Sequence, residues 1–199
     1  MSDSYKYVDP DYIYTDPKTG ILRNLAGLTD PDALLFFESG AVAKRIQELY
    51  ENPIEIKGIE SLFDIHRHLF QDVYAWAGEK RKVEISKEGK QFFPTTHFGN
   101  AFRFIDTLIS DYKKISNNNK QQIAEKLAEI LDTVNYLHPF REGNGRTQRE
   151  FLRLLALEKN LELNLNPPDN KNIYDQYMQG TINSDIKVLK KLILELIEK

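Results

Sequence analysis

Residues 137–149 read Leu-His-Pro-Phe-Arg-Glu-Gly-Asn-Gly-Arg-Thr-Gln-Arg, and they separate two segments whose apolar residues recur at helical spacing. Two glycines bracket Asn144, so the backbone can turn sharply there and can approach a ligand closely. The second helix is expected to begin near Gly145. Backbone N–H groups at a helix start, together with the positive end of the helix dipole, form a site for an anion. The sequence therefore predicts an anion-binding loop between two apolar helices.

The charged residues of this segment have complementary chemistry. Arg146 and Arg149 are three residues apart, so both can face the same anion, and a guanidinium group suits phosphate oxygens. Glu142 is a hard oxygen ligand of the kind that holds Mg²⁺ together with substrate phosphates. His138 can accept a proton near neutral pH. Together these residues predict a metal-assisted transfer reaction on a polyphosphate.

Each of these residues also has an ordinary structural interpretation. A histidine before proline can end a helix, glycines occur in any loop, and surface charges usually have no specific role. The whole segment in this order favours a site, with the exception of Phe140, which we expect to anchor the loop in the core. His66, His68 and His97 are interpreted as structural, because the first two lie on opposing sides of an expected helix and the third has no partner in sequence.

Other nucleotide-binding patterns are missing from the sequence. Gly89-Lys90 lacks both the upstream glycine and the hydroxyl residue of a P-loop. Gly143 and Gly145 are not followed by the third glycine of a dinucleotide-binding turn. A P-loop enzyme and a protein kinase are therefore both excluded.

The rest of the chain predicts a mostly helical domain. An arm over residues 1–30, rich in Tyr, Asp and Pro, is expected to pack on a domain over residues 31–199, because disordered segments usually lack aromatic residues. Residues 80–94 alternate around Val83 and Ile85 and contain a Gly turn, which indicates one short β-hairpin. Seven helices are expected, over residues 31–50, 59–76, 95–114, 120–136, 145–160, 170–180 and 185–197, the third of them capped by Thr95 or Thr96.

Composition narrows the class of protein. The 27 Lys and Arg residues and the 30 Asp and Glu residues give a net charge of −3, so we expect no direct binding of nucleic acid. There is no cysteine, which excludes a disulfide framework and a thiol nucleophile. No apolar run approaches the ~20 residues that span a bilayer, and the N-terminus is unlike a signal peptide. We therefore expect a cytoplasmic protein without membrane contact.

Residues 138–149 match the signature of the Fic family at every fixed position: His-x-Phe-x-(Asp/Glu)-Gly-Asn-Gly-Arg-x-x-Arg. The segment that ends Phe-Gln-Asp-Val-Tyr-Ala-Trp-Ala-Gly at residues 70–78 also resembles the family, and the resemblance extends over about residues 5–199. It implies an all-α Fic fold with a short β-hairpin flap. It also implies transfer of AMP from ATP to a Ser, Thr or Tyr hydroxyl of a target protein, with release of pyrophosphate.

The resemblance assigns a role to each motif residue. His138 would deprotonate the target hydroxyl, and Glu142 would hold a Mg²⁺ ion that bridges the α- and β-phosphates. The backbone of residues 143–145 and the side chain of Asn144 would form the anion hole. Arg146 would bind the β-phosphate and Arg149 the γ-phosphate.

Gly143, Asn144 and Gly145 thus belong to the nucleotide-binding set. The hairpin resembles the family's flap, on which an extended target segment docks by strand addition, and the candidate docking residues are Lys82, Val83, Glu84 and Ile85. The alternative is a covering flap without a docking role.

Regulation and partners follow from the same resemblance. Many Fic proteins carry an inhibitory Ser/Thr-x-x-x-Glu motif, but no Ser or Thr here has Glu four residues on. A separate antitoxin chain that supplies a glutamate to Arg149 is therefore the hypothesis for restraint. The target could be a subunit of a type II topoisomerase, as for some bacterial Fic toxins.

Three alternatives remain open at the level of sequence. The transferred group could be UMP, phosphocholine or phosphate rather than AMP, because two arginines do not distinguish a base. The chain could be a catalytically silent binding module. Finally, the arm tyrosines, Tyr5, Tyr7, Tyr12 and Tyr14, could be sites of self-modification, although aromatic packing of the arm explains them better.

Overall fold

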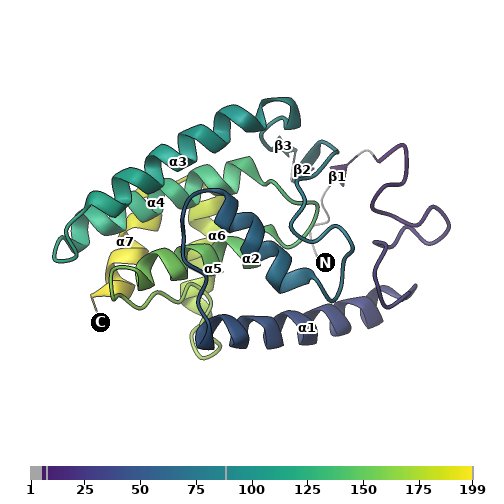
Figure 1. Cartoon of the computed structure of the whole chain (residues 1–199), viewed down its shortest axis with the longest axis horizontal. Helices are drawn as coiled ribbons and strands as arrows, with labels where there is room; N and C mark the ends of the chain where they lie inside the picture. Colours follow the sequence, from purple (N-terminus) through teal and green to yellow (C-terminus); the bar gives the residue numbers. More distant parts are fainter. Residues whose placement is uncertain (1–5, 8, 88, 199) are drawn as a thin grey trace.

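The computed structural model describes residues 6–7, 9–87 and 89–198 of the 199-residue chain, so the predicted arm residue Tyr5 lies outside the described residues (Figure 1). The first long helix, α1 (Pro31–Glu51), begins as its sequence predicts. The Asp30 carboxylate caps it by accepting the N–H of Ala33 at 2.8 Å, and Pro31 occupies the first turn, where its missing N–H costs nothing.

The described residues form seven α-helices and one 3₁₀ turn, which confirms the predicted mostly helical fold. After α1 they are α2 (Glu60–Phe70), the 3₁₀ turn η1 (Thr95–His97), α3 (Phe98–Lys114), α4 (Lys120–Leu137), α5 (Asn144–Leu157), α6 (Lys171–Asn183) and α7 (Ile186–Ile197). Within these residues, no helix has the length and apolar character needed to cross a bilayer.

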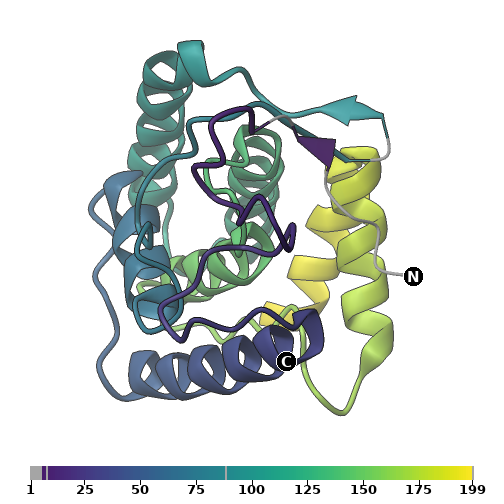
Figure 2. The ribbon, with the colours of Figure 1, turned by 90° about the vertical axis from the view of Figure 1, so that its right-hand side faces the viewer.

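Helix α5 is the centre of the core. Phe151, Leu152, Leu154 and Leu155 are all at most 1% exposed. It packs against α2 and α4, while α4 also contacts α3 and α7, and α1 packs on α2 (Figures 1 and 2). Because α4 and α5 are neighbours joined by six residues, the loop between them is held at both ends by buried helices.

The β structure contains more than the predicted hairpin. Strands β2 (Ile85–Lys87) and β3 (Lys90–Gln91) form the hairpin, with Gly89 in the turn at φ +79°. A third strand, β1 (Lys6–Tyr7), pairs antiparallel with the other edge of β2, with Tyr7 opposite Ile85. Part of the N-terminal arm thus completes a three-stranded sheet.

Two predicted helices differ at their ends. Helix α2 ends at Phe70 rather than near residue 76, because tertiary partners take over the following backbone: the Val73 carbonyl accepts the N–H of Leu25 from the arm at 2.8 Å. Neither predicted threonine caps α3. The hydroxyl of Thr95 donates instead to Glu84 at 2.6 Å, and α3 begins after η1.

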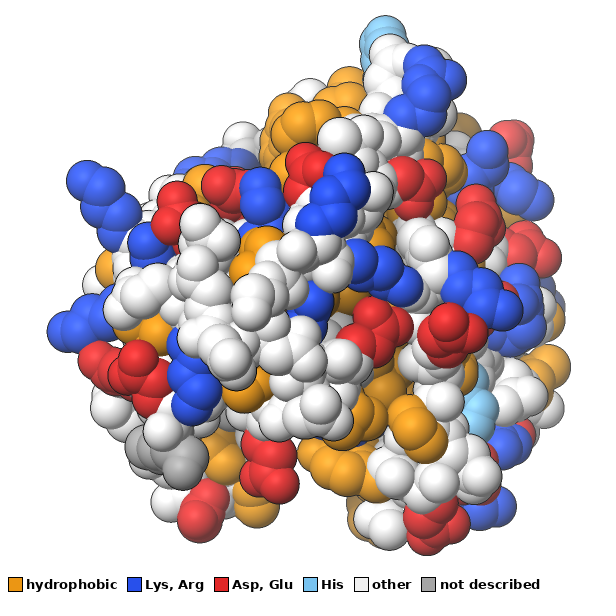
Figure 3. All heavy atoms as spheres, turned by 60° about the vertical axis from the view of Figure 1, so that its left-hand side comes forward, with side chains coloured by type: hydrophobic (Ala, Val, Ile, Leu, Met, Phe, Trp, Pro, Cys, Tyr) orange, Lys and Arg blue, Asp and Glu red, His pale blue; other side chains and the backbone are white. Residues whose placement is uncertain are grey.

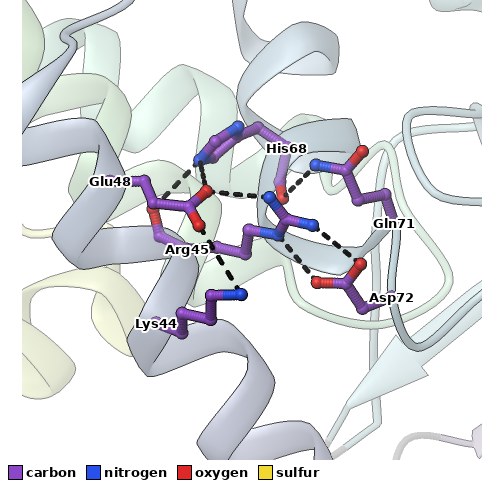
Figure 4. A network of polar contacts seen from close by, with 6 residues as sticks. All are labelled: Lys44, Arg45, Glu48, His68, Gln71 and Asp72. Atoms are coloured by element: carbon purple, nitrogen blue, oxygen red, sulfur yellow. Dashed lines mark hydrogen bonds and ion pairs between the residues drawn. The ribbon is translucent and has the colours of Figure 1, made fainter.

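The arm and α1 are each tied to the segment around α2. The Tyr14 side chain is buried, packs edge-on against Trp76 and accepts the Lys82 N–H. On α1, Arg45 binds Asp72 with two nitrogens (Figure 4). On the face shown in Figure 3, acidic and basic side chains are interspersed, as the small net charge suggests.

Candidate active site

The loop between α4 and α5 begins and ends in left-handed backbone. His138 is the C-cap of α4 at φ 44° and ψ 62°, and Gly143 is the N-cap of α5 at φ 81°. Gly143 also lies against the Phe70 ring so closely that any β-carbon would overlap it. The glycine is therefore required twice, for its conformation and for its contact.

The Asn144 side chain closes this loop. Its oxygen accepts the Phe140 N–H at 3.0 Å, and its nitrogen donates to the Phe140 carbonyl at 2.8 Å. Phe140 itself is fully buried, as predicted. Both ends of the Asn144 amide are thus bonded to the loop backbone, and the second N–H of its nitrogen is the donor that the predicted anion hole would use. Backbone N–H groups at the start of α5 are further donors for an anion at this turn.

His66 supports the same loop from α2. Its Nδ1 accepts the Gly78 N–H at 2.8 Å, so its Nε2 carries the proton and donates to the Glu142 carbonyl at 3.0 Å. The ring stacks on Phe140 with centroids 3.8 Å apart. Burial lowers the pKa of His66 to about 3, which keeps the ring neutral. The structural interpretation of His66 thus agrees with its position, and the ring also holds the motif loop.

The geometry of His138 fixes which of its nitrogens is basic. Nδ1 lies 3.0 Å from the Asn135 carbonyl oxygen, which can only accept, so Nδ1 carries the proton and Nε2 carries the lone pair. The imidazole stacks on Phe92, with centroids 3.8 Å apart. Burial lowers the pKa of His138 to about 3. The side chain is therefore a neutral imidazole with a base at Nε2.

A buried arginine connects this histidine to the hairpin. Arg81 is 1% exposed; its Nε donates to the His138 carbonyl at 2.8 Å, and its two terminal nitrogens donate to the carbonyls of Val83 (2.8 Å) and Phe93 (2.5 Å). The backbone N–H of Arg81 donates to the Pro139 carbonyl at 2.7 Å. Arg81 therefore holds both sides of the hairpin against the backbone of the motif.

The two predicted phosphate-binding arginines have different surroundings. Arg146 Nη2 lies 2.5 Å from Glu38 Oε1 and 3.5 Å from Glu142 Oε1, and its guanidinium covers the Phe70 ring at 4.8 Å. The Arg149 guanidinium lies over the rings of two tyrosines of α6, at 5.5 Å from the centroid of Tyr174 and 5.6 Å from that of Tyr177.

A cavity of about 630 Å³ unites the site. Of the predicted residues, it is lined by His138, Glu142, Gly143, Gly145, Arg146 and Arg149. Asn144 is buried behind this surface. The hairpin forms one wall through Lys87, Lys90, Gln91 and Phe92, and α6 forms another. A base, a carboxylate and two cations thus face one space large enough for a nucleotide.

The predicted docking residues lie beside this wall. Val83 and Ile85 are buried, the Lys82 side chain is exposed, and Glu84 accepts the Thr95 N–H at 2.9 Å. Only Ile85 lies within a strand, and its outer edge is already paired with β1.

The donor set at Glu142 fits a magnesium ion that is bound together with a phosphate substrate. The Glu142 carboxylate lines the cavity and accepts the Gly143 N–H at 2.8 Å. In the part of the chain that the structure describes, no group of three His, Cys, Asp or Glu side chains could hold a metal ion alone. One carboxylate plus substrate phosphates is a usual way to bind Mg²⁺.

Sequence reasoning missed Glu38, Arg81, Tyr174 and Tyr177. Tyr174 and Tyr177 lie 25 and 28 positions after Arg149, Glu38 lies 108 positions before Arg146, and Arg81 lies in the predicted hairpin, so no spacing rule connects them with the motif. The signal that finds them is spatial: each contacts a motif arginine or the backbone of His138.

Comparisons with known proteins agree with this geometry. The profile described as the Fic/DOC family matches residues 57–156, about half of the chain. The protein adenylyltransferase VbhT of Bartonella schoenbuchensis is 36% identical over 154 residues, which cover 77% of this chain but 32% of VbhT, so the chain spans about a third of that relative. The probable protein adenylyltransferase y4lH of Sinorhizobium fredii is 32% identical over 178 residues, or 88% of this chain and 90% of y4lH.

Solved structures share the fold. The N-terminal FIC domain of the Bartonella effector Bep8 superposes with a TM-score of 0.81 at 20% sequence identity, over 94% of this chain and 94% of that one. At this identity the likeness describes the arrangement of helices.

Proposed function

The chain belongs to the Fic/DOC family, and from that membership we propose that it is a protein adenylyltransferase, which transfers AMP from ATP to a hydroxyl of a target protein. The observation that carries the proposal is the shared cavity: His138, Glu142, Arg146 and Arg149 all line it. The names of the relatives VbhT and y4lH support the same activity.

The reaction balances with these residues. The oxygen of a target Ser, Thr or Tyr attacks the α-phosphorus of ATP while its proton passes to Nε2 of His138. The bond between the α-phosphorus and the bridging oxygen breaks, and pyrophosphate leaves in line with the attack. A neutral His138 with its proton on Nδ1 is the form that this step needs.

The remaining residues stabilise the polyphosphate. Arg146 binds the β-phosphate and Arg149 the γ-phosphate, and backbone N–H groups of residues 143–145 bind the oxygens beside them. Glu142 would hold Mg²⁺, which would neutralise phosphate charge. We expect the reaction in the cytoplasm, where ATP and Mg²⁺ are abundant.

The target segment docks at the hairpin in this proposal. Strand addition needs an unpaired strand edge, and the outer edge of β2 is paired with Lys6–Tyr7. A target must therefore displace β1 or add to β3. A topoisomerase subunit is a candidate target, and self-modification of the arm is a second candidate outcome.

A separate antitoxin chain remains the proposal for restraint. Arg149 lines the cavity, so a glutamate from another chain could reach it and take the place of the γ-phosphate. Equal labelling of targets with and without a candidate partner chain would count against this idea.

The test is transfer from labelled ATP in a bacterial lysate, followed by mass spectrometry of the labelled protein. Label at the α-phosphate should move to protein, whereas label at the γ-phosphate should not. Competition by unlabelled ATP, UTP and CDP-choline identifies the transferred group. Transfer of γ-label would indicate phosphate transfer, and the absence of all transfer and of pyrophosphate release with any target would indicate a binding module.

A further inference from the structure

A carboxylate outside the family match reaches the site. Glu38 belongs to α1, ahead of the matched residues 57–156. It is 5% exposed, and its Oε1 lies 2.5 Å from Arg146 Nη2. Its second oxygen, Oε2, accepts the hydroxyl proton of Tyr74. A buried carboxylate is costly unless it is paired, and both oxygens of Glu38 have a partner.

Glu38 lies behind Arg146 rather than in front of it. Arg146 and Glu142 line the cavity, whereas Glu38 is not part of the cavity wall. The Phe70 ring lies against the guanidinium at 4.8 Å, and the Glu142 carboxylate lies beside it at 3.5 Å. The guanidinium is therefore held from its buried side while it still faces the nucleotide space.

We propose that Glu38 is a positioning residue that holds Arg146 in the orientation in which it binds the β-phosphate of the nucleotide. The inference rests on the proposed function, because it takes the assignment of Arg146 from there. A long side chain loses rotamer freedom when it binds a ligand, and fixing the side chain beforehand reduces that loss.

Tyr74 fixes Glu38 in turn. Its ring stacks on Trp76 with centroids 4.3 Å apart, which sets the direction of the hydroxyl. Burial, together with the Glu38 charge, raises the pKa of Tyr74 far above its ordinary value, so the hydroxyl remains a donor. Tyr74, Glu38 and Arg146 thus form a chain from the core to the cavity.

The test measures the affinities of the whole chain for ADP and AMP, which differ only by the β-phosphate. The variants are Glu38→Gln, which removes the charge, and Tyr74→Phe, which removes only the hydroxyl. The control is Glu48→Gln, because Glu48 is on the same helix and pairs with an arginine remote from the cavity. Calorimetry gives both dissociation constants, and thermal unfolding gives the stability of each variant.

We expect the wild-type chain to bind ADP more tightly than AMP. Glu38→Gln should weaken ADP binding about tenfold, in the range of one charged hydrogen bond, and leave AMP binding unchanged. Tyr74→Phe should act in the same direction with a smaller effect. Glu48→Gln should keep the wild-type ratio of the two constants.

Three results would overturn the inference. An unchanged ratio in Glu38→Gln would make the contact merely structural, and tighter ADP binding would make Glu38 a competitor of the phosphate. If Glu38→Gln does not fold, an unchanged ratio in Tyr74→Phe decides against the inference. Equal binding of ADP and AMP by the wild-type chain would instead overturn the assignment of Arg146 itself, and therefore the proposal on which the inference rests.

Discussion

Two arginines, Arg45 and Arg146, are each held by a carboxylate of α1, yet their surroundings differ. Arg45 donates from Nε and Nη2 to Asp72 and from Nη1 to Glu48, at 2.7 to 2.8 Å (Figure 4). These bonds raise the pKa of Arg45 and lower that of Asp72. Every nitrogen of that guanidinium is in use.

Arg146 is held on one side only. Among the residues that the structure describes, both of its ion pairs run through Nη2, and the side chain lines a cavity. The comparison teaches that an ion pair alone does not identify a site. The two arginines differ in this respect: all nitrogens of the Arg45 guanidinium are bonded, whereas the Arg146 guanidinium still faces the cavity. Paired variants test this difference.

The largest expected contrast is between two histidines: His138, which lines the cavity, and His68, which belongs to the network around Arg45. His138→Ala removes the base and should lower AMP transfer by about 100-fold or more, with nucleotide binding kept. The Nε2 of His68 donates to the Arg45 carbonyl in the network remote from the cavity, so His68→Ala should keep the transfer rate. The readout is the rate of label transfer at saturating ATP. Wild-type transfer by His138→Ala would contradict the mechanism.

The next contrast is between the arginines themselves. Arg146→Ala should raise KM for ATP by roughly 10- to 100-fold, because it removes a charged contact worth about 1.5 to 3 kcal/mol. Arg45→Ala should leave KM unchanged and lower the melting temperature by a few degrees. Steady-state kinetics and thermal unfolding separate the two effects. A raised KM for ATP in Arg45→Ala would show that the network around Arg45 also affects nucleotide binding.

A smaller contrast concerns two glycines. Gly143→Ala should lower the free energy of unfolding by about 1 to 3 kcal/mol, since the residue is left-handed and its β-carbon would overlap Phe70. Gly40 lies within α1 with open space around it, so Gly40→Ala should stabilise the chain by up to about 1 kcal/mol. Denaturant unfolding of both variants measures the difference. An unchanged free energy of unfolding in Gly143→Ala would show that the loop accommodates a β-carbon without cost.

The smallest expected change is in the pH dependence of transfer. Because burial lowers the pKa of His138 to about 3, the base is already neutral at pH 6, and the transfer rate should stay nearly constant between pH 6 and pH 8. A twofold fall near pH 6.5 would show that the site restores an ordinary histidine pKa.

Stability should nevertheless respond to acid. His138 and His66 both have a lowered pKa in the folded chain, so the unfolded chain binds more protons below pH 6.5. Their contribution to stability is complete above pH 6.5 and is lost as the pH falls toward about 3. Unfolding curves at several pH values should show this slope, and His138→Ala should make it shallower.

The sequence predicts best what is local. The order of residues 138–149 predicts the site, because its base, carboxylate and arginines lie on a single loop and the first turns of one helix. Helix starts such as Asp30-Pro31 are predicted for the same reason: the cap and the first turn are neighbours in the chain.

Tertiary contacts decide the rest. The end of α2 depends on Leu25 from the arm, and the third strand depends on residues 6–7 meeting β2 about 80 positions away. No local sequence pattern identifies Arg81 or Glu38. Their roles are inferred from the folded structure, in which Arg81 contacts His138 and Glu38 contacts Arg146. The bonds from the Asn144 amide to Phe140 likewise depend on the geometry of the folded loop.

The left-handed backbone at His138 has a consequence for the history of such a gene. Gly adopts this conformation without strain, and Asn and His enter it more readily than most other residues with a β-carbon. A single nucleotide change from a histidine to an asparagine codon would therefore remove the base without straining the backbone. The same change would lose the stacking of the imidazole on Phe92, so the fold and the reaction both favour His138.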